Sequence, residues 1–101
     1  MTKTDPHPES DPGYIDHKDQ LHNRMRRIAG QVNGIERMIA EERYCIDILT
    51  QISAAQAALD KVALALLEDH AHHCVVGADE ENRAEKTTEM MAAVGRLVGA
   101  R

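Results

Sequence analysis

The segment 45–74 constrains the fold most, because it contains neither glycine nor proline. Apolar residues recur in it at three- and four-residue spacing, the pattern of an amphipathic helix. A helix rises about 1.5 Å per residue, so Cys45 is expected roughly 37 Å from His70. Two residues so far apart on one straight helix cannot contact each other.

Three soft metal donors lie in this segment. His70 and Cys74 are four residues apart and share one helix face, whereas Cys45 is at the opposite end. Cys45 can join the pair only if a second copy of the helix packs antiparallel, and a two-fold axis then repeats the arrangement at the other end. The spacing therefore predicts two equivalent metal sites, each shared between two chains.

Two thiolates and one imidazole favour Cu(I), which accepts three ligands, whereas structural Zn(II) normally takes four. His72 and His73 are expected to point away from the ligand face. His7 or His17, in the N-terminal region, could add a fourth ligand and shift the preference to Ni(II), Co(II) or Zn(II). The alternative that both cysteines are merely small buried side chains is less favoured, because the histidine–cysteine pair shares a face.

Composition favours an all-α protein. The 101 residues include no Trp or Phe and two Tyr, and aliphatic residues dominate. So small a chain buries only about 60–65% of its unfolded surface, so oligomerisation would enlarge its core. The two cysteines are too far apart for an intrachain disulfide, which predicts reduced thiols and a cytoplasmic location. No apolar run approaches the roughly 18 residues of a membrane span.

The segments outside 45–74 have distinct patterns. Residues 1–13 hold all three prolines and are predicted to be a disordered tail, with one helical domain over 14–101. A first helix is expected from about Asp16 to Glu42, with Gly30 and Gly34 on one face where another backbone approaches closely. Gly77 is expected to end the second helix in a left-handed conformation, and Asp79 to cap a third helix over 80–98.

The charge distribution limits the choice of partner. The net charge of −5 argues against indiscriminate nucleic-acid binding, yet residues 17–43 hold six basic and four acidic residues. Arg24, Arg27 and Gln31 are expected on one side of the first helix, where they could contact phosphates and base edges. The sequence has no helix-turn-helix pattern, so the usual DNA-reading architecture is absent. It has no glycine-rich phosphate loop and no paired carboxylates at a recognisable spacing, so an enzyme is not expected.

Three stretches resemble the CsoR/RcnR family of bacterial metal-sensing repressors, and in particular its copper-sensing CsoR branch. They are residues 21–38 (LHNRMRRIAGQVNGIERM), 44–54 (YCIDILTQISA) and 66–74 (LLEDHAHHC). The resemblance covers roughly residues 14–98. It implies a three-helix protomer, a dimer built as an antiparallel four-helix bundle, and a dimer of dimers that binds operator DNA. Binding of Cu(I) would release the DNA and derepress copper-resistance genes.

The resemblance also implies roles for individual residues. Cys45 of one protomer would join His70 and Cys74 of the other, which agrees with the spacing argument. Tyr44 and a glutamate of the third helix, Glu89 or Glu85, match residues just outside the metal ligands. The DNA-contacting positions of the family fall on Arg24 and Lys61, with Gln31 in the same matching stretch.

Three other functions remain open at this point. Nickel and cobalt sensors of the same family recruit a histidine before the first helix, where this chain has Gly13, with His17 about one turn later. A helical Cu(I)-buffering protein would need the metal donors but not the basic face. A thiol-based redox sensor would crosslink Cys45 and Cys74 between chains. The complete Cys-His-Cys set argues against the formaldehyde- and persulfide-responsive branches.

Overall fold

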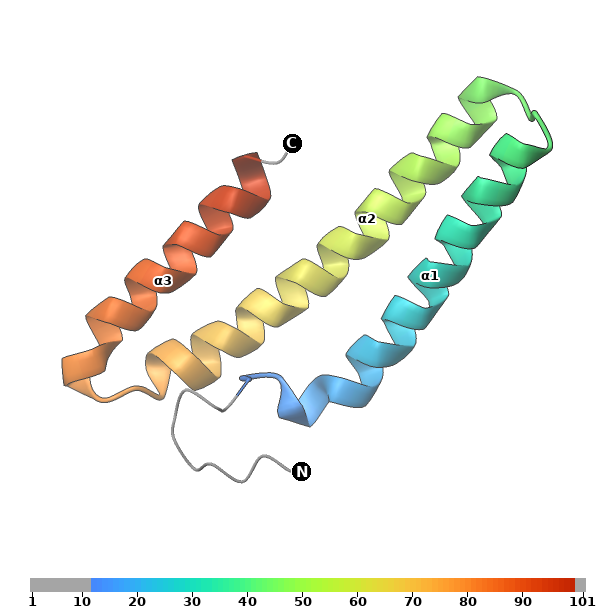
Figure 1. Ribbon diagram of the computed structural model, residues 1–101. Helices are drawn as coiled ribbons and strands as arrows, with labels where there is room; N and C mark the ends of the chain where they lie inside the picture. The colour runs from blue at the N-terminus through green and yellow to red at the C-terminus, as the bar shows by residue number, and fades with distance from the viewer. Residues whose placement is uncertain (1–11, 100–101) are drawn as a thin grey trace. The chain divides into compact units, whose positions relative to one another are not determined.

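The computed structural model describes residues 12–99 and contains three α-helices: α1 (Lys18–Ala40), α2 (Cys45–His70) and α3 (Glu80–Gly99) (Figure 1). A short 3-10 helix, η2 (Ile15–His17), precedes α1, and a π-helix, η3 (Ala71–Val76), continues α2. The described residues form no strand. The predicted all-α class and three-helix protomer are confirmed. No helix within residues 12–99 combines the length and hydropathy needed to cross a membrane.

The described residues divide into two compact units, one formed by residues 16–64 and the other by residues 12–15 together with 65–99. In the first unit, α1 and the first twenty residues of α2 run antiparallel, joined by a turn at 41–44 (Figure 1). Leu21 and Ile28 from α1 are buried, as are Ala55 and Val62 from α2. Each pair is seven residues apart, so one stripe of each helix forms the core of this unit.

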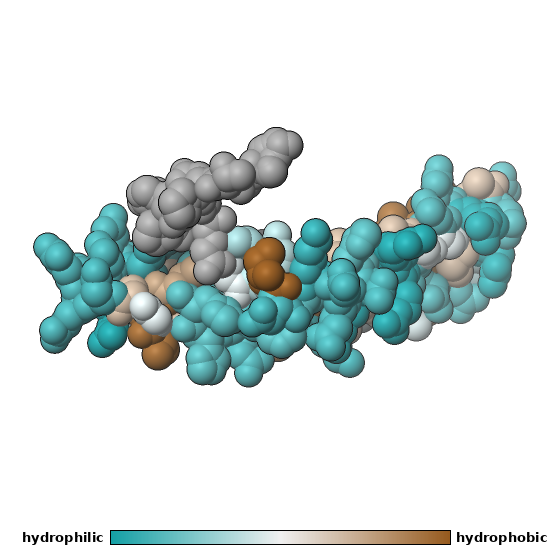
Figure 2. Space-filling model, turned by 90° about the horizontal axis from the view of Figure 1, so that it is seen from below, coloured by the Kyte–Doolittle hydropathy of each residue, from teal (hydrophilic) through white to brown (hydrophobic). Residues whose placement is uncertain are grey.

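Both helices of this unit carry apolar side chains beyond that core. Met25, Val32 and Ile39 repeat at seven-residue spacing on α1 and are 41%, 52% and 59% exposed. Leu49 and Leu59 of α2 are 57% and 43% exposed. Figure 2 shows a largely hydrophilic face interrupted by small hydrophobic clusters. A single chain therefore leaves apolar surface on these helices in contact with water.

The two glycines of α1 do not meet another backbone within this chain. A Cβ atom added at Gly30 or Gly34 would find no described atom within 4 Å, apart from its chain neighbours and the backbone of its own helix. The expected close approach is therefore not made by the described chain itself. Any backbone that fills this space must come from elsewhere.

The second unit contains the end of α2, then η3 and α3. Its α3 helix packs against η3. Asp79 caps α3 as predicted: its Oδ1 accepts a hydrogen bond from the backbone N–H of Asn82 at 3.0 Å. The first turn also carries Glu80 and Glu81, whose charges favour the helix N-terminus.

The expected conformation of Gly77 is wrong. Its φ of −76° is right-handed, so no left-handed cap ends the second helix. Glycine is needed here for space instead, because an added Cβ would lie 3.0 Å from the carbonyl oxygen of His73. The helical segment is continuous to Val76, as its spacing predicts, but its last six residues adopt the wider π-helical hydrogen-bonding pattern.

Candidate metal site and nucleic-acid interface

The three predicted metal donors lie on one continuous helical segment. Cys45 is the first residue of α2 and is exposed, and His70 is the last. The 26 residues of α2 separate them by about 37 Å at the usual helical rise. Within residues 12–99, no group of three or more His, Cys, Asp or Glu side chains could hold one metal ion. One chain thus presents a two-donor half-site and a distant single donor.

His70 and Cys74 form the two-donor half-site. Both are half-buried, with His70 ending α2 and Cys74 inside η3. Each π-helical bond spans five residues instead of four, and residues four apart still lie on neighbouring parts of one face. Neither cysteine forms a disulfide. The local helical geometry therefore places a thiol next to an imidazole.

The imidazole of His70 lacks a hydrogen bond at one of its nitrogens within the described chain. His70 Nε2 is buried and has no hydrogen-bond partner among the described residues. A buried polar atom left in this state costs about 1–3 kcal/mol. A thiol and an imidazole nitrogen are donors that soft metal ions prefer. The chemistry and burial of this pair therefore fit a metal ion better than a purely structural role.

An open pocket of about 340 Å³ adjoins His70. Glu89 of α3 lines it together with Tyr14 and Arg96, whereas Glu85 lines a separate pocket that also includes Glu89. Of the two candidate glutamates, Glu89 is the one that shares a pocket with a predicted ligand. Tyr44 is 67% exposed and directly precedes Cys45.

The structure places Gly13 beside the two-donor half-site. Gly13 is buried, and a Cβ added to it would lie 3.3 Å from Cys74 Sγ and 3.7 Å from the Cα of His70. Its φ of +91° lies in the region that favours glycine. The signal in the sequence is the resemblance, which aligns Gly13 with the histidine that nickel and cobalt sensors of the family recruit before the first helix.

The other histidines considered as ligands are exposed or lie outside the described chain. His72 and His73 are exposed, as predicted, with ring centroids 6.4 Å apart. His17 ends η2 and is exposed. His7 lies outside the described residues, as does most of the predicted tail 1–13. The structure therefore does not test whether His7 donates a ligand.

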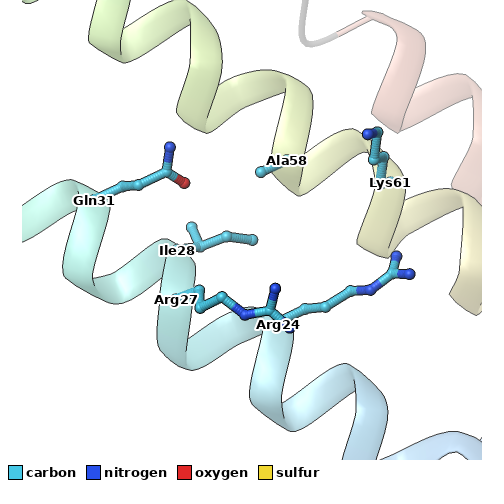
Figure 3. A pocket seen from close by; sticks show the side chains of 6 residues that line it. All are labelled: Arg24, Arg27, Ile28, Gln31, Ala58 and Lys61. Atoms are coloured by element: carbon cyan, nitrogen blue, oxygen red, sulfur yellow. The ribbon is translucent and has the colours of Figure 1, made fainter.

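The four predicted DNA-binding residues surround one cleft in the first unit. Its volume is about 460 Å³, and α1 contributes Arg24, Arg27 and Gln31 while α2 contributes Lys61 (Figure 3). Ile28 and Ala58 form an apolar floor between the helices. The described lining includes three cations and no carboxylate, so this cleft is suited to an anion.

The turn at 41–44 returns α2 alongside α1, which brings Lys61 near residues some thirty to forty positions earlier in the chain. Sequence periodicity alone grouped only the α1 residues. The cleft therefore contains both the α1 residues predicted from their spacing and Lys61, which was assigned by resemblance.

A comparison of the sequence with known families supplies the decisive observation. The profile described as "Metal-sensitive transcriptional repressor" matches residues 17–96, which include both the cleft and the half-site. The chain belongs to this repressor family. The family description combines a response to metal with repression of transcription. A metal-donor pair and a basic cleft in one chain agree with that combination.

Similar members of the family carry more specific names. The chain is 59% identical over 69 residues to the copper-sensing transcriptional repressor CsoR of Bacillus subtilis, covering 68% of each chain. It is 52% identical over 89 residues to the copper-sensing transcriptional repressor RicR of Mycobacterium tuberculosis, covering 85% of this chain and 93% of RicR.

Solved structures support the same fold. The crystal structure of the copper-sensing repressor CsoR with Cu(I) from Geobacillus thermodenitrificans matches with a TM-score of 0.75 and 38% identity, covering 97% of this chain and 94% of that one. The nickel-responsive transcriptional regulator InrS matches with a TM-score of 0.67 and 37% identity, covering 77% and 89%. Metal-sensitive repressors that respond to different metals thus share this helical arrangement.

Proposed function

We propose that this protein is a Cu(I)-responsive transcriptional repressor whose metal-free form binds operator DNA and whose Cu(I)-bound form releases it, derepressing copper-resistance genes. One observation carries the proposal: His70 and Cys74 form a half-site that no third donor of the described chain completes, while Cys45 lies at the far end of the same helix. The relatives named for copper sensing support the choice of metal.

A second copy of the chain completes the site in this proposal. Antiparallel packing places Cys45 of one protomer beside His70 and Cys74 of the other, giving two sites per dimer. The exposed stripe of Met25, Val32 and Ile39 supplies apolar surface for this contact. The open space at the two α1 glycines leaves room for another backbone to approach. The dimer is a four-helix bundle, and two dimers form the tetramer that binds DNA.

The protein's own residues couple the metal site to the basic cleft. Cys45 of one protomer and His70 with Cys74 of the other would hold a bound Cu(I), whose bonds to these soft donors would tie the two protomers together. Cys45 lies at the turn that returns α2 alongside α1, so a constraint on this residue acts on the pairing of the two helices that line the basic cleft. Tyr44 and Glu89 hold the ligands in orientation from beside Cys45 and His70.

The basic cleft is the DNA-contacting surface in this proposal. Arg24, Arg27 and Lys61 neutralise phosphates, and Gln31 reaches the bases or the backbone beside them. Metal and DNA must weaken each other's binding by the same factor, and typical couplings are about 1–3 kcal/mol. The protein acts in the cytoplasm, with residues 14–101 as its metal-sensing and DNA-binding domain, and catalyses no reaction.

The test is a titration of DNA affinity with metal. Fluorescence anisotropy measures binding to a duplex selected from random sequence by the metal-free protein, under nitrogen and with reductant. One equivalent of Cu(I) per protomer is expected to weaken binding by about tenfold to a hundredfold, the range of 1–3 kcal/mol. Equal affinity with and without Cu(I) would refute the proposal.

Nickel sensing is the second candidate, favoured by the likeness to InrS at 37% identity. The same titration with Ni(II), Co(II) and Zn(II) distinguishes the two candidates. A nickel sensor would release DNA in response to Ni(II), whereas a copper sensor would release it in response to Cu(I). A protein that only buffers Cu(I) would bind the metal without selecting any duplex. A thiol redox sensor would respond to oxidant after His70→Ala.

A further inference from the structure

Arg96 of α3 lines the pocket that adjoins His70. Among the described residues of this lining, Arg96 is the only arginine or lysine, and Glu89 is the only carboxylate. The other lining residues are apolar except for Tyr14 and His70. A single guanidinium therefore borders the pocket beside a predicted metal ligand.

The positive charge of Arg96 is not compensated within the described chain. Arg96 is exposed and forms no ion pair with another residue of the range 12–99. Glu89, seven residues earlier on the same face of α3, is paired instead with Lys86, whose Nζ lies 3.9 Å from Glu89 Oε1. The guanidinium of Arg96 thus remains available to another negative charge.

A filled Cu(I) site would supply that negative charge. Two thiolates contribute two negative charges and Cu(I) one positive charge, so a site completed by a neutral imidazole is a monoanion. Thiols are mostly protonated at neutral pH, and each releases its proton to solvent when it binds the metal. The site therefore changes from neutral to anionic with Cu(I), whereas it stays neutral with a divalent ion such as Co(II).

The surroundings of the half-site make an added negative charge unfavourable. Glu68 and Asp69 directly precede His70, and Asp69 is buried. Cys74 also lies near the C-terminal end of the helical segment, where the helix dipole places partial negative charge. A nearby cation therefore stabilises the anionic Cu(I) site more than it stabilises a neutral site that holds a divalent ion.

We propose that Arg96 is the charge-compensating residue of the metal site: its guanidinium stabilises the anionic Cu(I) complex and so favours monovalent over divalent ions. The inference rests on the proposed function, because it takes His70, Cys74 and the Cys45 of a second copy as the ligands. It goes beyond that function by assigning a role to a residue outside both the ligand set and the basic cleft. Arg96 donates no atom to the metal.

Metal affinities of full-length variants test this inference. Cu(I) and Co(II) affinities are each measured by competition with a chelator, under nitrogen and at low ionic strength. Arg96→Gln is expected to weaken Cu(I) binding by about 2–5-fold and Co(II) binding by less than about 1.5-fold, the scale of an exposed charge interaction. Arg96→Lys keeps the positive charge and should restore the Cu(I) affinity.

A control variant and a salt series separate local charge from other effects. Arg26→Gln removes the same charge from an exposed residue of α1 that lies outside this lining, and it should leave both affinities unchanged. The effect of Arg96→Gln should largely disappear at about 1 M salt, where the screening length is roughly 3 Å. Circular dichroism checks that each variant retains its helix content.

Three outcomes would overturn the inference. Equal losses of Cu(I) and Co(II) affinity in Arg96→Gln would mean that Arg96 supports the fold of the site and not its charge. An unchanged Cu(I) affinity, or a loss that Arg96→Lys does not restore, would exclude charge compensation. Because these measurements involve no DNA, failure of bound Cu(I) to release DNA would refute the proposed function alone.

Discussion

At the scale of single residues, Cys74 has the most stringent chemical requirement. Serine at this position keeps nearly the same volume but replaces a soft thiolate with a hard hydroxyl oxygen. We expect Cys74→Ser to lower Cu(I) affinity by more than about 100-fold, since even residues outside the ligand set typically account for 10–100-fold. Competition with a Cu(I) chelator measures this loss.

The same variant should still bind DNA when metal-free, because the basic cleft lies on other residues. It should therefore remain bound at Cu(I) concentrations that release the unmodified protein. His73→Ala, which alters an exposed neighbour, serves as the control and should respond normally. A Cys74→Ser protein that releases DNA at the usual Cu(I) concentration would exclude Cys74 as a ligand.

Gly77 is constrained by the space around it and not by its backbone conformation. A Cβ added there would meet the carbonyl oxygen of His73 at 3.0 Å, while φ is an ordinary −76°. We expect Gly77→Ala to destabilise the protein by about 1–3 kcal/mol through this overpacking. Urea unfolding followed by circular dichroism measures the change. Gly95→Ala should instead stabilise α3 by up to about 1 kcal/mol, since its added Cβ finds open space.

At the scale of elements, α1 and α2 make the basic cleft together. Lys61 comes from α2 and Arg24 from α1, so neither helix alone supplies the full set of cations. We expect Arg24→Ala or Lys61→Ala to weaken DNA binding and to reduce the slope of log K against log salt by about one. Anisotropy titrations at several salt concentrations measure both effects.

Arg26 provides the matched control for this prediction. It is an exposed arginine on the same helix and does not line the cleft. Arg26→Ala removes the same charge, so it isolates the effect of position from the effect of net charge. Equal losses in all three variants would mean that general basicity, and not the cleft, binds DNA.

At the scale of the whole molecule, the exposed apolar stripe on α1 is expected to be the contact between copies. Val32 is 52% exposed and lies midway between Met25 and Ile39. An aspartate placed there would be buried unpaired in the dimer. We expect Val32→Asp to weaken self-association by at least about tenfold, which corresponds to ~1.4 kcal/mol.

Sedimentation velocity over a concentration series measures this association. Asn33→Asp adds the same charge one position away, at an exposed residue of the same helix, and is the control. If Val32→Asp associates as tightly as the control, the stripe does not form the dimer contact.

Mixing two inactive variants tests the sharing of the metal site between chains. Cys45→Ser and Cys74→Ser should each lack intact sites as homodimers. A mixed dimer regains one site, made by Cys45 of one chain with His70 and Cys74 of the other. Unfolding and refolding an equal mixture should restore about a quarter of the Cu(I) sites of the unmodified protein. Ligands contributed by one chain alone would give no recovery.

The sequence by itself determined the features that depend on neighbouring residues. Apolar spacing in 45–74 predicted one long helix, and Asp79 predicted the start of α3, because helical periodicity and capping involve residues only a few positions apart. The four-residue spacing of His70 and Cys74 placed two donors together for the same reason. The length of that helix also separated Cys45 from them.

Only the tertiary structure decided which distant groups meet. Lys61 joins Arg24 because a turn returns α2 alongside α1, and Gly13 lies near Cys74 because residues 12–14 lie against the end of the helical segment. Gly77 was expected to supply a left-handed φ, whereas the carbonyl oxygen of His73 sets its steric requirement. Such contacts depend on how elements pack, and local periodicity carries no information about the atoms that packing brings together.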